Sequence, residues 1–512
     1  MFKYLTRFAN IIALFVVLQA LVFASLVFGI ARIYPPAGIA LIVFSVLCAL
    51  FVASGESHSA YKLAWVTVIM LLPLFGGMFY VFYSRKRYDK ELCRSLAECI
   101  ARALSYQNKD EIGLTLSAPC SHIALYLENT VGFSPALSNN AVYFAVGEEK
   151  IAHMLDEISK AERYIFLEYF IIADGILWES FYEILKKKAG EGVDVRIICD
   201  GVGCLYALPW KFTREMAQVG IKVRMFNPVR PFISARINSR SHRKMAVIDG
   251  KTAFCGGINL ADEYANLKEK YGHWKDSGVK VDGGTAWNMT LLFLSMWEYL
   301  GKERGTVDYK VFQPQANVPD VSHNNDYESG LSLSVPVLDV PKDGIHVSEH
   351  TFISFILRAE KSVYITTPYL ICGGEILSAL YTAARSGVDV RVITPYIADK
   401  KIVKLATESY YRALIENGVR IFEYLPGFIH AKNIIADGKR AMVGTVNLDY
   451  RSLYLHHECG VCFFGGQIIK DIDDDFRVTF GQCKEVTLSD LGKVSLFKRV
   501  GGRACRLLAP FL

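Results

Sequence analysis

Two clusters of histidine, lysine and aspartate recur in the chain with the same spacing. In each cluster a His is followed by one residue, a Lys, four residues and an Asp, and an Asn lies ten residues further on. These positions are His242, Lys244, Asp249 and Asn259 in the first cluster, and His430, Lys432, Asp437 and Asn447 in the second. Corresponding positions lie 188 residues apart, so chance is a poor explanation for the pattern.

Side chains of these types suit the exchange of one phosphodiester for another. That reaction needs a nucleophile, a proton donor for the departing alkoxide, and positive charge beside the phosphate oxygens. Two imidazoles, which titrate near about 6.5, can supply the nucleophile and the acid or base near neutral pH. The two lysines would supply the charge, assisted by the amides of Asn259 and Asn447. The sequence therefore predicts chemistry that needs no metal and no cofactor.

Each motif is expected on an extended strand. In the second motif Ala431 separates His430 from Lys432, so the His and the Lys point to one face and the Ala to the other. The Asp-Gly pairs that end both motifs are typical of hairpin turns. A turn explains the aspartates, but it does not explain a His and a Lys on strands that ought to be buried.

The repetition extends beyond the motifs. Strand-like segments precede each motif with helix-like stretches between them, and a short acidic segment follows it. The corresponding pairs are 164–168 with 363–367, 192–198 with 387–393, and 276–279 with 458–461. Each half thus reads strand, helix, strand, helix and hairpin, which predicts an α/β fold with two sandwich domains around mixed sheets.

These observations divide the chain into six parts. The predicted parts are a transmembrane anchor of two or three helices at 1–84, a connector at 85–130, the first repeat domain at 131–312, a polar linker at 313–340, the second repeat domain at 341–485, and a basic and apolar tail at 486–512.

The anchor is expected in three apolar segments, 8–30, 39–53 and 63–83. The first and third are long enough to cross a bilayer as helices, and the middle one is marginal. A signal peptide is a poor alternative, because the first apolar run is too long and no cleavage site follows it. The basic cluster at 85–87 predicts a multi-pass protein of the cell membrane with cytoplasmic catalytic domains.

Composition adds weaker constraints. Hydrophobic residues make up 52% of the chain and charged residues 21%, which fits a membrane part joined to a soluble part. The net charge of +6 is a mild bias, and no basic stretch is interleaved with aromatic residues, so nucleic acid is not an expected partner. The 12 cysteines form no disulfide or metal-site framework, which favours a reducing compartment for the soluble part.

The duplicated motif resembles the signature of the phospholipase D superfamily, over about residues 140 to 485. Four strings are also similar to bacterial cardiolipin synthases, as are 61–65 and 73–77 in the apolar leader. The four strings are 226–231, 239–244, 256–264 and 446–452.

The resemblance implies two domains related by pseudo-twofold symmetry, with one active site at their interface. It implies that His242 is the nucleophile and His430 the acid and base, although the two motifs are symmetric. It also implies that Asp249 and Asp437 belong to the catalytic group with the histidines and lysines and support the site. Asp276 and Glu458 are implied to orient the histidines through their second ring nitrogen. At position 276 the superfamily often has Glu.

The implied reaction joins two phosphatidylglycerol molecules, as donor and acceptor, into cardiolipin and glycerol through a phosphohistidine intermediate. Besides phosphatidylglycerol, the implied partner is the lipid bilayer. Three alternatives stay open: a membrane phospholipase D that hydrolyses phospholipid to phosphatidic acid, a phosphodiester nuclease of the same superfamily, and a membrane scaffold without activity. Neither motif has lost a member, which argues against the scaffold. The sequence does not indicate an oligomeric state.

Overall fold

The computed structural model describes most of the chain, and the fold below refers to these residues. They are 25, 29, 32–55, 58–72, 76–77, 80–81, 86–108, 118–138, 140–229, 238–301, 305–314, 332–341, 345–507 and 509–511. Almost all of the predicted apolar segment 8–30 and most of the predicted linker lie outside them.

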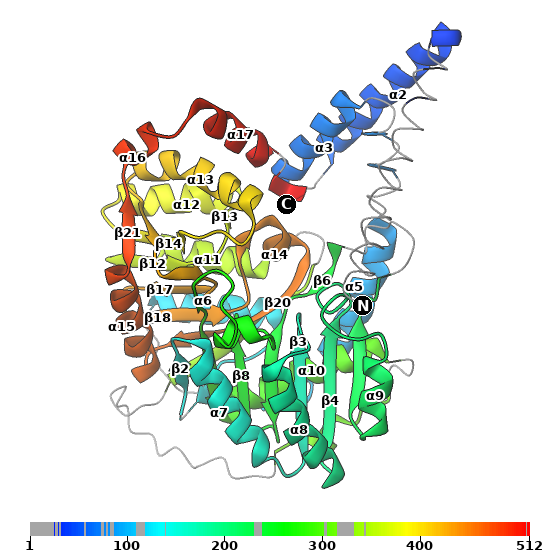
Figure 1. Ribbon diagram of the computed structural model, residues 1–512, viewed down its shortest axis with the longest axis vertical. Helices are drawn as coiled ribbons and strands as arrows, with labels where there is room; N and C mark the ends of the chain where they lie inside the picture. Colours follow the sequence, from blue (N-terminus) through cyan, green and yellow to red (C-terminus); the bar gives the residue numbers. More distant parts are fainter. Residues whose placement is uncertain are drawn as a thin grey trace.

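The first half is built on a seven-stranded mixed sheet (Figure 1). Its order is β2 (Val142–Phe144), β10 (Gly278–Asp282), β8 (Thr252–Gly256), β7 (Lys244–Ile248), β3 (Tyr164–Tyr169), β4 (Asp194–Asp200) and β5 (Lys222–Phe226). Its helices are α7 (Gly147–Ser159), α8 (Ile176–Gly190), α9 (Phe212–Gln218) and α10 (Gly283–Leu300).

The second half repeats this arrangement and adds strands at both edges. The order is β1 (Ala136–Ser138), β11 (Ser332–Asp339), β20 (His456–Phe464), β18 (Arg440–Gly444), β17 (Asn433–Ala436), β12 (Ser362–Thr366), β14 (Asp389–Pro395), β15 (Arg420–Tyr424) and β21 (Cys483–Val486). Its helices are α11 (Val347–Leu357), α12 (Gly374–Arg385), α13 (Lys401–Glu416), α14 (Tyr450–Tyr454) and α15 (Gln467–Gly481).

The six strands from β10 to β5 have the same order and directions as those from β20 to β15. In both halves β-branched and aliphatic residues fill the parallel strands, whose faces are both covered by helices. This confirms the predicted α/β fold with two repeated domains. Two elements cross the expected divisions: β1 joins the second sheet, and β11 occupies the end of the range assigned to the linker. The alternating apolar residues of β11 are all buried, which explains why this segment is a strand.

Two short parallel pairings join the halves. β6 (Arg240–Ser241), just before His242, pairs with the start of β20, and β16 (Gly427–Ile429), just before His430, pairs with β9 (His273–Lys275). The first extends the second sheet and the second is a separate pair of strands. These two pairings are equivalent under the pseudo-twofold relation, so each motif begins on a strand that is held by the other half.

The main core also spans both halves. Nearly all of α10 is buried, and it contacts strands of the first sheet as well as β1 and β11 of the second. The connector is helical as expected, with α5 (Lys86–Leu104) packed along α10 and α6 (Ala118–Val131) packed on α11. A second core lies on the other face of the first sheet, beneath α7, α8 and α9.

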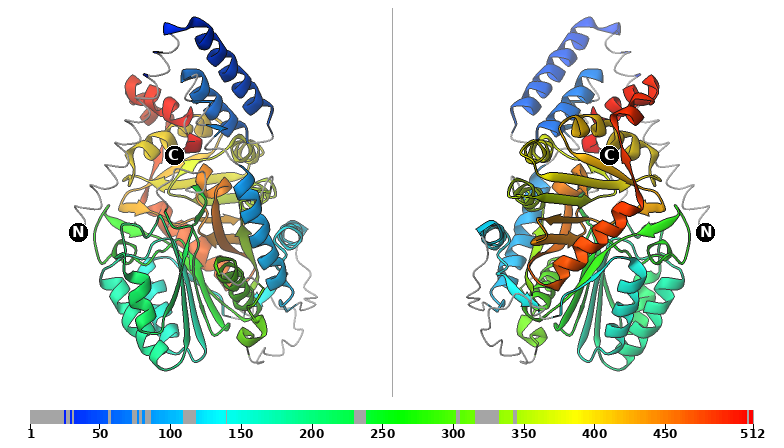
Figure 2. Two further views of the ribbon diagram at one scale, coloured as in Figure 1. Left: turned by 90° about the vertical axis from the view of Figure 1, so that its right-hand side faces the viewer. Right: turned by 90° about the vertical axis from the view of Figure 1, so that its left-hand side faces the viewer.

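The apolar N-terminal part forms a pair of adjacent helices, α2 (Pro35–Ser54) and α3 (Ser59–Leu71), which project from the second half (Figure 2). Among the described residues α2 alone is long and apolar enough to cross a membrane, although the sequence pattern made this segment the marginal one. In contrast, α3 is shorter than predicted and ends at Leu71. Pro73 follows it in the sequence, and proline disfavours the helical conformation in the residue before it.

The base of α3 is docked on the second half. His58 caps α3, and its Nε2 lies 3.0 Å from an oxygen of Glu375 on α12. The same imidazole packs on the rings of Tyr450 and Tyr454 in α14. After β21 the chain forms α16 (Leu488–Gly492), α17 (Leu496–Leu507) and the 3-10 turn η4 (Ala509–Phe511), and the last two contact α3.

Candidate active site

The two histidines occupy equivalent positions where the halves meet. Each follows a short strand that pairs with the other half and precedes a central strand of its own sheet. The backbone N–H of His242 donates to the carbonyl of His457 at 2.9 Å, and that of His430 donates to the carbonyl of Lys275 at 2.7 Å. The two side chains are 9% and 8% exposed, so each imidazole sits in an almost closed site.

Each imidazole is paired with a carboxylate from the other half. Nδ1 of His242 lies 2.9 and 3.0 Å from the two oxygens of Glu458, and Nδ1 of His430 lies 2.6 Å from Oδ2 of Asp276. The structure therefore brings together four of the residues that the sequence singled out. The pairing is crossed, because each His belongs to one half and its carboxylate to the other.

The electrostatics of these pairs fix where the proton lies. His242, His456 and Lys244 outweigh the cost of burying Glu458, and Lys432 and His430 do the same for Asp276, so both carboxyl pKa values lie below their usual range. An ionised carboxylate accepts a hydrogen bond, so each Nδ1 carries a proton. Burial lowers the pKa of His242 to about 3 and that of His430 to about 4. Both imidazoles are therefore neutral at pH 7, with a lone pair on Nε2.

Both lysines lie at the same site. The ammonium of Lys244 donates to the carbonyl of His242 at 2.5 Å, and that of Lys432 donates to the carbonyl of His430. Burial lowers the pKa of Lys244 to about 8 and that of Lys432 to about 7. Lys244 also contributes to the lowered pKa values of His430 and Lys432, which places the two motifs within electrostatic reach of each other.

The asparagines lie beside the motifs with different hydrogen bonds. Oδ1 of Asn259 accepts from the backbone N–H of Ile171 at 3.0 Å. Asn447 is 5% exposed, and its Oδ1 has no hydrogen-bond partner among the described residues. Of the two amides, that of Asn447 is the one left available for a ligand.

Aromatic rings enclose the histidines, and sequence reasoning did not identify them. Phe170 packs edge-on against His242 at 5.1 Å between ring centres, and Tyr264 and Trp274 pack on His430 at 5.4 and 5.5 Å. His456 was also missed, and its ring lies 5.4 Å from that of His242. The adjacent pair His456-His457 before Glu458 is the one signal in the sequence that could have pointed to it.

The two motif aspartates were expected in the catalytic group, but in the structure their carboxylates bind backbone N–H groups. The carboxylate of Asp249 accepts from the backbone N–H groups of Glu162, Arg163 and Tyr164 at 2.8 to 2.9 Å. Asp437 binds three consecutive N–H groups before β12 in the same way. Both aspartates have positive φ, 52° and 57°, in the hairpin turns after β7 and β17. Asp249 is five residues beyond Lys244, roughly 16 Å along the strand, so these carboxylates hold the sheet and not the substrate.

The motif glycines permit close contact between β8 and β10. At Gly256, where φ is 144°, a Cβ would lie 2.4 Å from the carbonyl oxygen of Ser277. At Gly257 a Cβ would lie 2.1 Å from Oδ1 of Asp276. A side chain at either position would push on the strand that carries the carboxylate of His430.

Two clusters of described residues have a spacing compatible with metal ligands. His242, His456 and Glu458 place ligand atoms within 4.8 Å of one another, as do His58, Glu349 and Glu375 at the base of α3. Hydrogen bonds account for both. The oxygens of Glu458 accept from Thr445 and Ser452 besides His242, and in the second cluster Glu375 is paired with His58 while Glu349 accepts from Tyr454.

Comparison with known proteins identifies relatives over most of the chain. Residues 154–274 and 352–479 match the family described as cardiolipin synthase, PLD-like domain, and residues 40–85 match a phospholipase D-nuclease N-terminal family. The chain is 32% identical to a cardiolipin synthase of Geobacillus thermodenitrificans, covering 92% of this chain and 93% of that protein. It is 30% identical to a cardiolipin synthase of Alkalihalophilus pseudofirmus, covering 98% and 99%.

A solved structure has the same fold. The crystal structure of phosphatidylserine synthase from Haemophilus influenzae superposes with a TM-score of 0.58 at 15% identity, covering 77% of this chain and 99% of that one. At this identity the likeness establishes the arrangement of the two halves.

The placement of Asp249 predicts a loss of stability without a loss of chemistry. In Asp249→Asn one carboxylate oxygen becomes an amide donor that faces a backbone N–H, which should destabilise the protein by about 2 kcal/mol. The turnover of the folded protein should stay within a factor of two. Thermal unfolding in detergent and turnover per folded molecule measure the two quantities. A large loss of turnover at an unchanged unfolding temperature would show that Asp249 takes part in catalysis.

The placement of Gly257 predicts a loss of turnover in a protein that still folds. Gly257→Ala should displace Asp276 and lower turnover at least about 100-fold, because His430 loses the group that orients it. The variant should still fold, since the atoms nearest to the added Cβ belong to the side chain of Asp276 and not to the backbone. Gly190→Ala is the matched control, because a Cβ there meets nothing within 4 Å. Equal turnover in the two variants would show that the carboxylate of Asp276 does not position His430.

Proposed function

The chain belongs to the cardiolipin synthase family of phospholipase D-like proteins, and from this we propose that it transfers a phosphatidyl group from one phosphatidylglycerol to another, releasing glycerol. The observation that carries the proposal is the pair of neutral imidazoles, each held at Nδ1 by a carboxylate of the other half. Relatives named cardiolipin synthase support the choice of lipid substrates.

In the proposed first step, Nε2 of His242 attacks the phosphorus of the donor lipid. A P–N bond forms, the P–O bond to glycerol breaks, and His430 gives its proton to the departing glycerol oxygen. His430 is neutral in the free enzyme, and a bound phosphodiester anion beside it would raise its affinity for a proton. Glu458 stabilises the positive charge that develops on His242.

In the proposed second step, a hydroxyl of the second phosphatidylglycerol gives its proton to His430 and attacks phosphorus. The P–N bond breaks, cardiolipin leaves, and both imidazoles return to their starting states. One phosphodiester replaces another, so the overall reaction needs no external energy source. The assignment of the nucleophile to the first motif follows the family resemblance.

Lys244 and Lys432 are proposed to neutralise the phosphate oxygens in both steps. Their ammonium groups lie at the carbonyls of the two histidines, so they stand beside any phosphorus that the imidazoles approach. Positive charge in a site of low dielectric stabilises a transition state more than it would in water. Asn447, whose Oδ1 lacks a described partner, is proposed to bind a hydroxyl of the headgroup.

Burial favours transfer to a lipid over hydrolysis. The histidines are almost fully enclosed and lined by Phe170, Tyr264 and Trp274, which limits the access of water to the intermediate. A tethered enzyme also meets its lipid acceptor at high local concentration. We propose that α2 anchors the chain in the cell membrane as part of a multi-pass segment, with the catalytic halves on the cytoplasmic side.

The two-histidine mechanism predicts that product formation requires both imidazoles. His242→Ala and His430→Ala should each abolish product formation in a bacterial host that lacks cardiolipin, and His122→Ala, on α6, should not. Lipid extraction and chromatography measure cardiolipin, and labelled phosphatidylglycerol identifies glycerol or phosphatidic acid as the released product. Cardiolipin at the wild-type level in either variant would remove the mechanism, and phosphatidic acid as the main product of the wild type would establish a hydrolase instead.

The lowered pKa values predict an unusual pH profile. In the free enzyme both imidazoles are neutral above about pH 4, whereas the first step needs a protonated His430, so kcat/KM should rise as the pH falls from about 7 to about 5. Above pH 7 to 8 it should fall, since Lys432 and Lys244 lose their charge there. Initial rates in mixed micelles between pH 5 and 10 measure the profile. An acidic limb near pH 6.5, typical of an unperturbed imidazole, would contradict this account.

A further inference from the structure

The C-terminal helix α17 packs on the protein through its smallest residues. Gly501 and Gly502 face α13, and Gly502 is buried. A Cβ on Gly502 would lie 3.1 Å from the carbonyl oxygen of Leu405 and 3.3 Å from Cβ of Ser409. The absence of a side chain at Gly502 thus allows the helix to lie directly on α13. The residues of α17 in closest contact with α13 are therefore glycines, and not its large apolar residues.

The large apolar side chains of α17 point away from the protein. Leu496, Phe497 and Val500 are 72%, 93% and 57% exposed. Val500 lies three residues after Phe497 and four residues after Leu496, so the three side chains form one stripe along the helix. A water-soluble protein normally turns such a stripe toward its core, and here the stripe faces outward.

Two arginines border the stripe and have no ionic partner among the described residues. Arg499 and Arg503 are one turn apart on the same side of α17, and neither forms an ion pair there. The other cations of the helix are engaged: Lys498 lies 2.6 Å from Glu408, and Arg506 stacks on the ring of Tyr410 at 4.1 Å. The helix therefore presents outward both an apolar stripe and two uncompensated positive charges.

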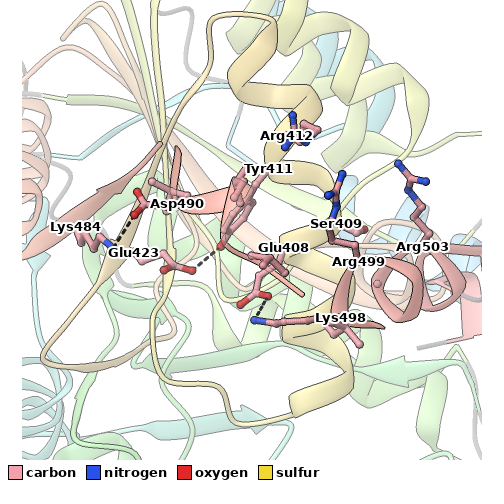
Figure 3. Close-up of a pocket in the computed structure, with 15 residues that line it drawn as sticks. Glu408, Ser409, Tyr411, Arg412, Glu423, Lys484, Asp490, Lys498, Arg499 and Arg503 are labelled. Atoms are coloured by element: carbon pink, nitrogen blue, oxygen red, sulfur yellow. Dashed lines mark hydrogen bonds and ion pairs between the residues drawn. The ribbon is translucent and has the colours of Figure 1, made fainter. Parts of the chain in front are cut away.

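The acidic side chains around the cavity beneath α17 do not pair with these arginines. A cavity of about 210 Å³ lies between α17, α13 and β21, and Arg499 and Arg503 are among the residues that line it. Its acids, however, are already paired with Lys498, Tyr411 and Lys484 (Figure 3). In the same view the guanidinium groups of Arg499 and Arg503 extend to one side, away from the acidic side chains.

The position of α17 identifies what it faces. It contacts α3, and η4 after it also contacts α3, so the helix lies beside the base of the α2–α3 pair in both side views (Figure 2). α2 is the helix that is long and apolar enough to cross a membrane, and Ile39 and Phe51 on it are 65% and 70% exposed. A bilayer crossed by α2 would begin close to α17.

We propose that α17 is an interfacial helix that lies in the surface of an anionic bilayer, with Leu496, Phe497 and Val500 among the acyl chains and Arg499 and Arg503 at lipid phosphates. An apolar stripe bordered by basic residues is the pattern that binds such surfaces. The helix seats the second half on the membrane at a second point beside α3. This surface is separate from the histidine site and does not depend on the reaction there.

A photocrosslinking experiment tests the proposal on the full chain. A benzophenone amino acid replaces Val500, or Val478 on α15, which is a matched valine that is 62% exposed. Both proteins carry His242→Ala, so no lipid is converted and the outcome is independent of the proposed reaction. They are reconstituted in vesicles of phosphatidylglycerol and phosphatidylcholine with labelled phosphatidylcholine as tracer. Lipid adducts should form at position 500 several-fold more than at position 478.

Charge reversal completes the test. Arg499→Glu with Arg503→Glu should lower the adduct yield at position 500, by about fivefold for each arginine removed. Lys186→Glu with Lys187→Glu, the same charge change on α8, should leave the yield unchanged. Vesicles of phosphatidylcholine alone should also lower it. Equal yields at positions 500 and 478, or adducts at position 500 to a second copy of the chain in place of lipid, would overturn the proposal.

Discussion

The crossed pairing of imidazole and carboxylate is the constraint on which the rest of the structure depends. His242 meets Glu458 and His430 meets Asp276, so neither half holds an oriented histidine by itself. The pairing requires that the short strand before each motif runs beside the residues just before the other half's carboxylate, which the pairs β6–β20 and β9–β16 achieve. It also requires the close approach that Gly256 and Gly444 allow. One site made from two halves follows from these contacts.

Burial gives this site its chemistry. Ionised carboxylates and lysines are expensive to remove from water, and here they offset one another across a short distance. The carboxylates hold the proton on Nδ1 of each ring, and the low pKa values of the rings keep Nε2 free at neutral pH. The same burial lowers the pKa of Lys244 to about 8 and that of Lys432 to about 7, close to neutral pH. The proposed nucleophilicity and the proposed phosphate binding thus have one common cause.

The sequence was sufficient for the features that repeat and insufficient for those that do not. Spacing alone identified both histidines, both lysines and the α/β halves. It could not show that the carboxylate partners are exchanged, because that depends on contacts between residues more than 150 positions apart. The family resemblance placed Asp249 at the site, although the Asp-Gly pair that ends the motif already fitted a hairpin turn. Tyr264 and Trp274 escaped notice because aromatic residues are frequent and usually pack in cores.

The central claim is that the two motifs form a single site, and counting covalent intermediates tests it most directly. A phosphatidyl p-nitrophenol substrate without an acceptor hydroxyl would leave the intermediate on the enzyme, and an alkaline quench would preserve the P–N bond for mass spectrometry. The account predicts a burst of one nitrophenol per chain and one phosphatidyl group, on the imidazole of His242. Two groups per chain, on His242 and on His430, would show two independent sites and contradict it.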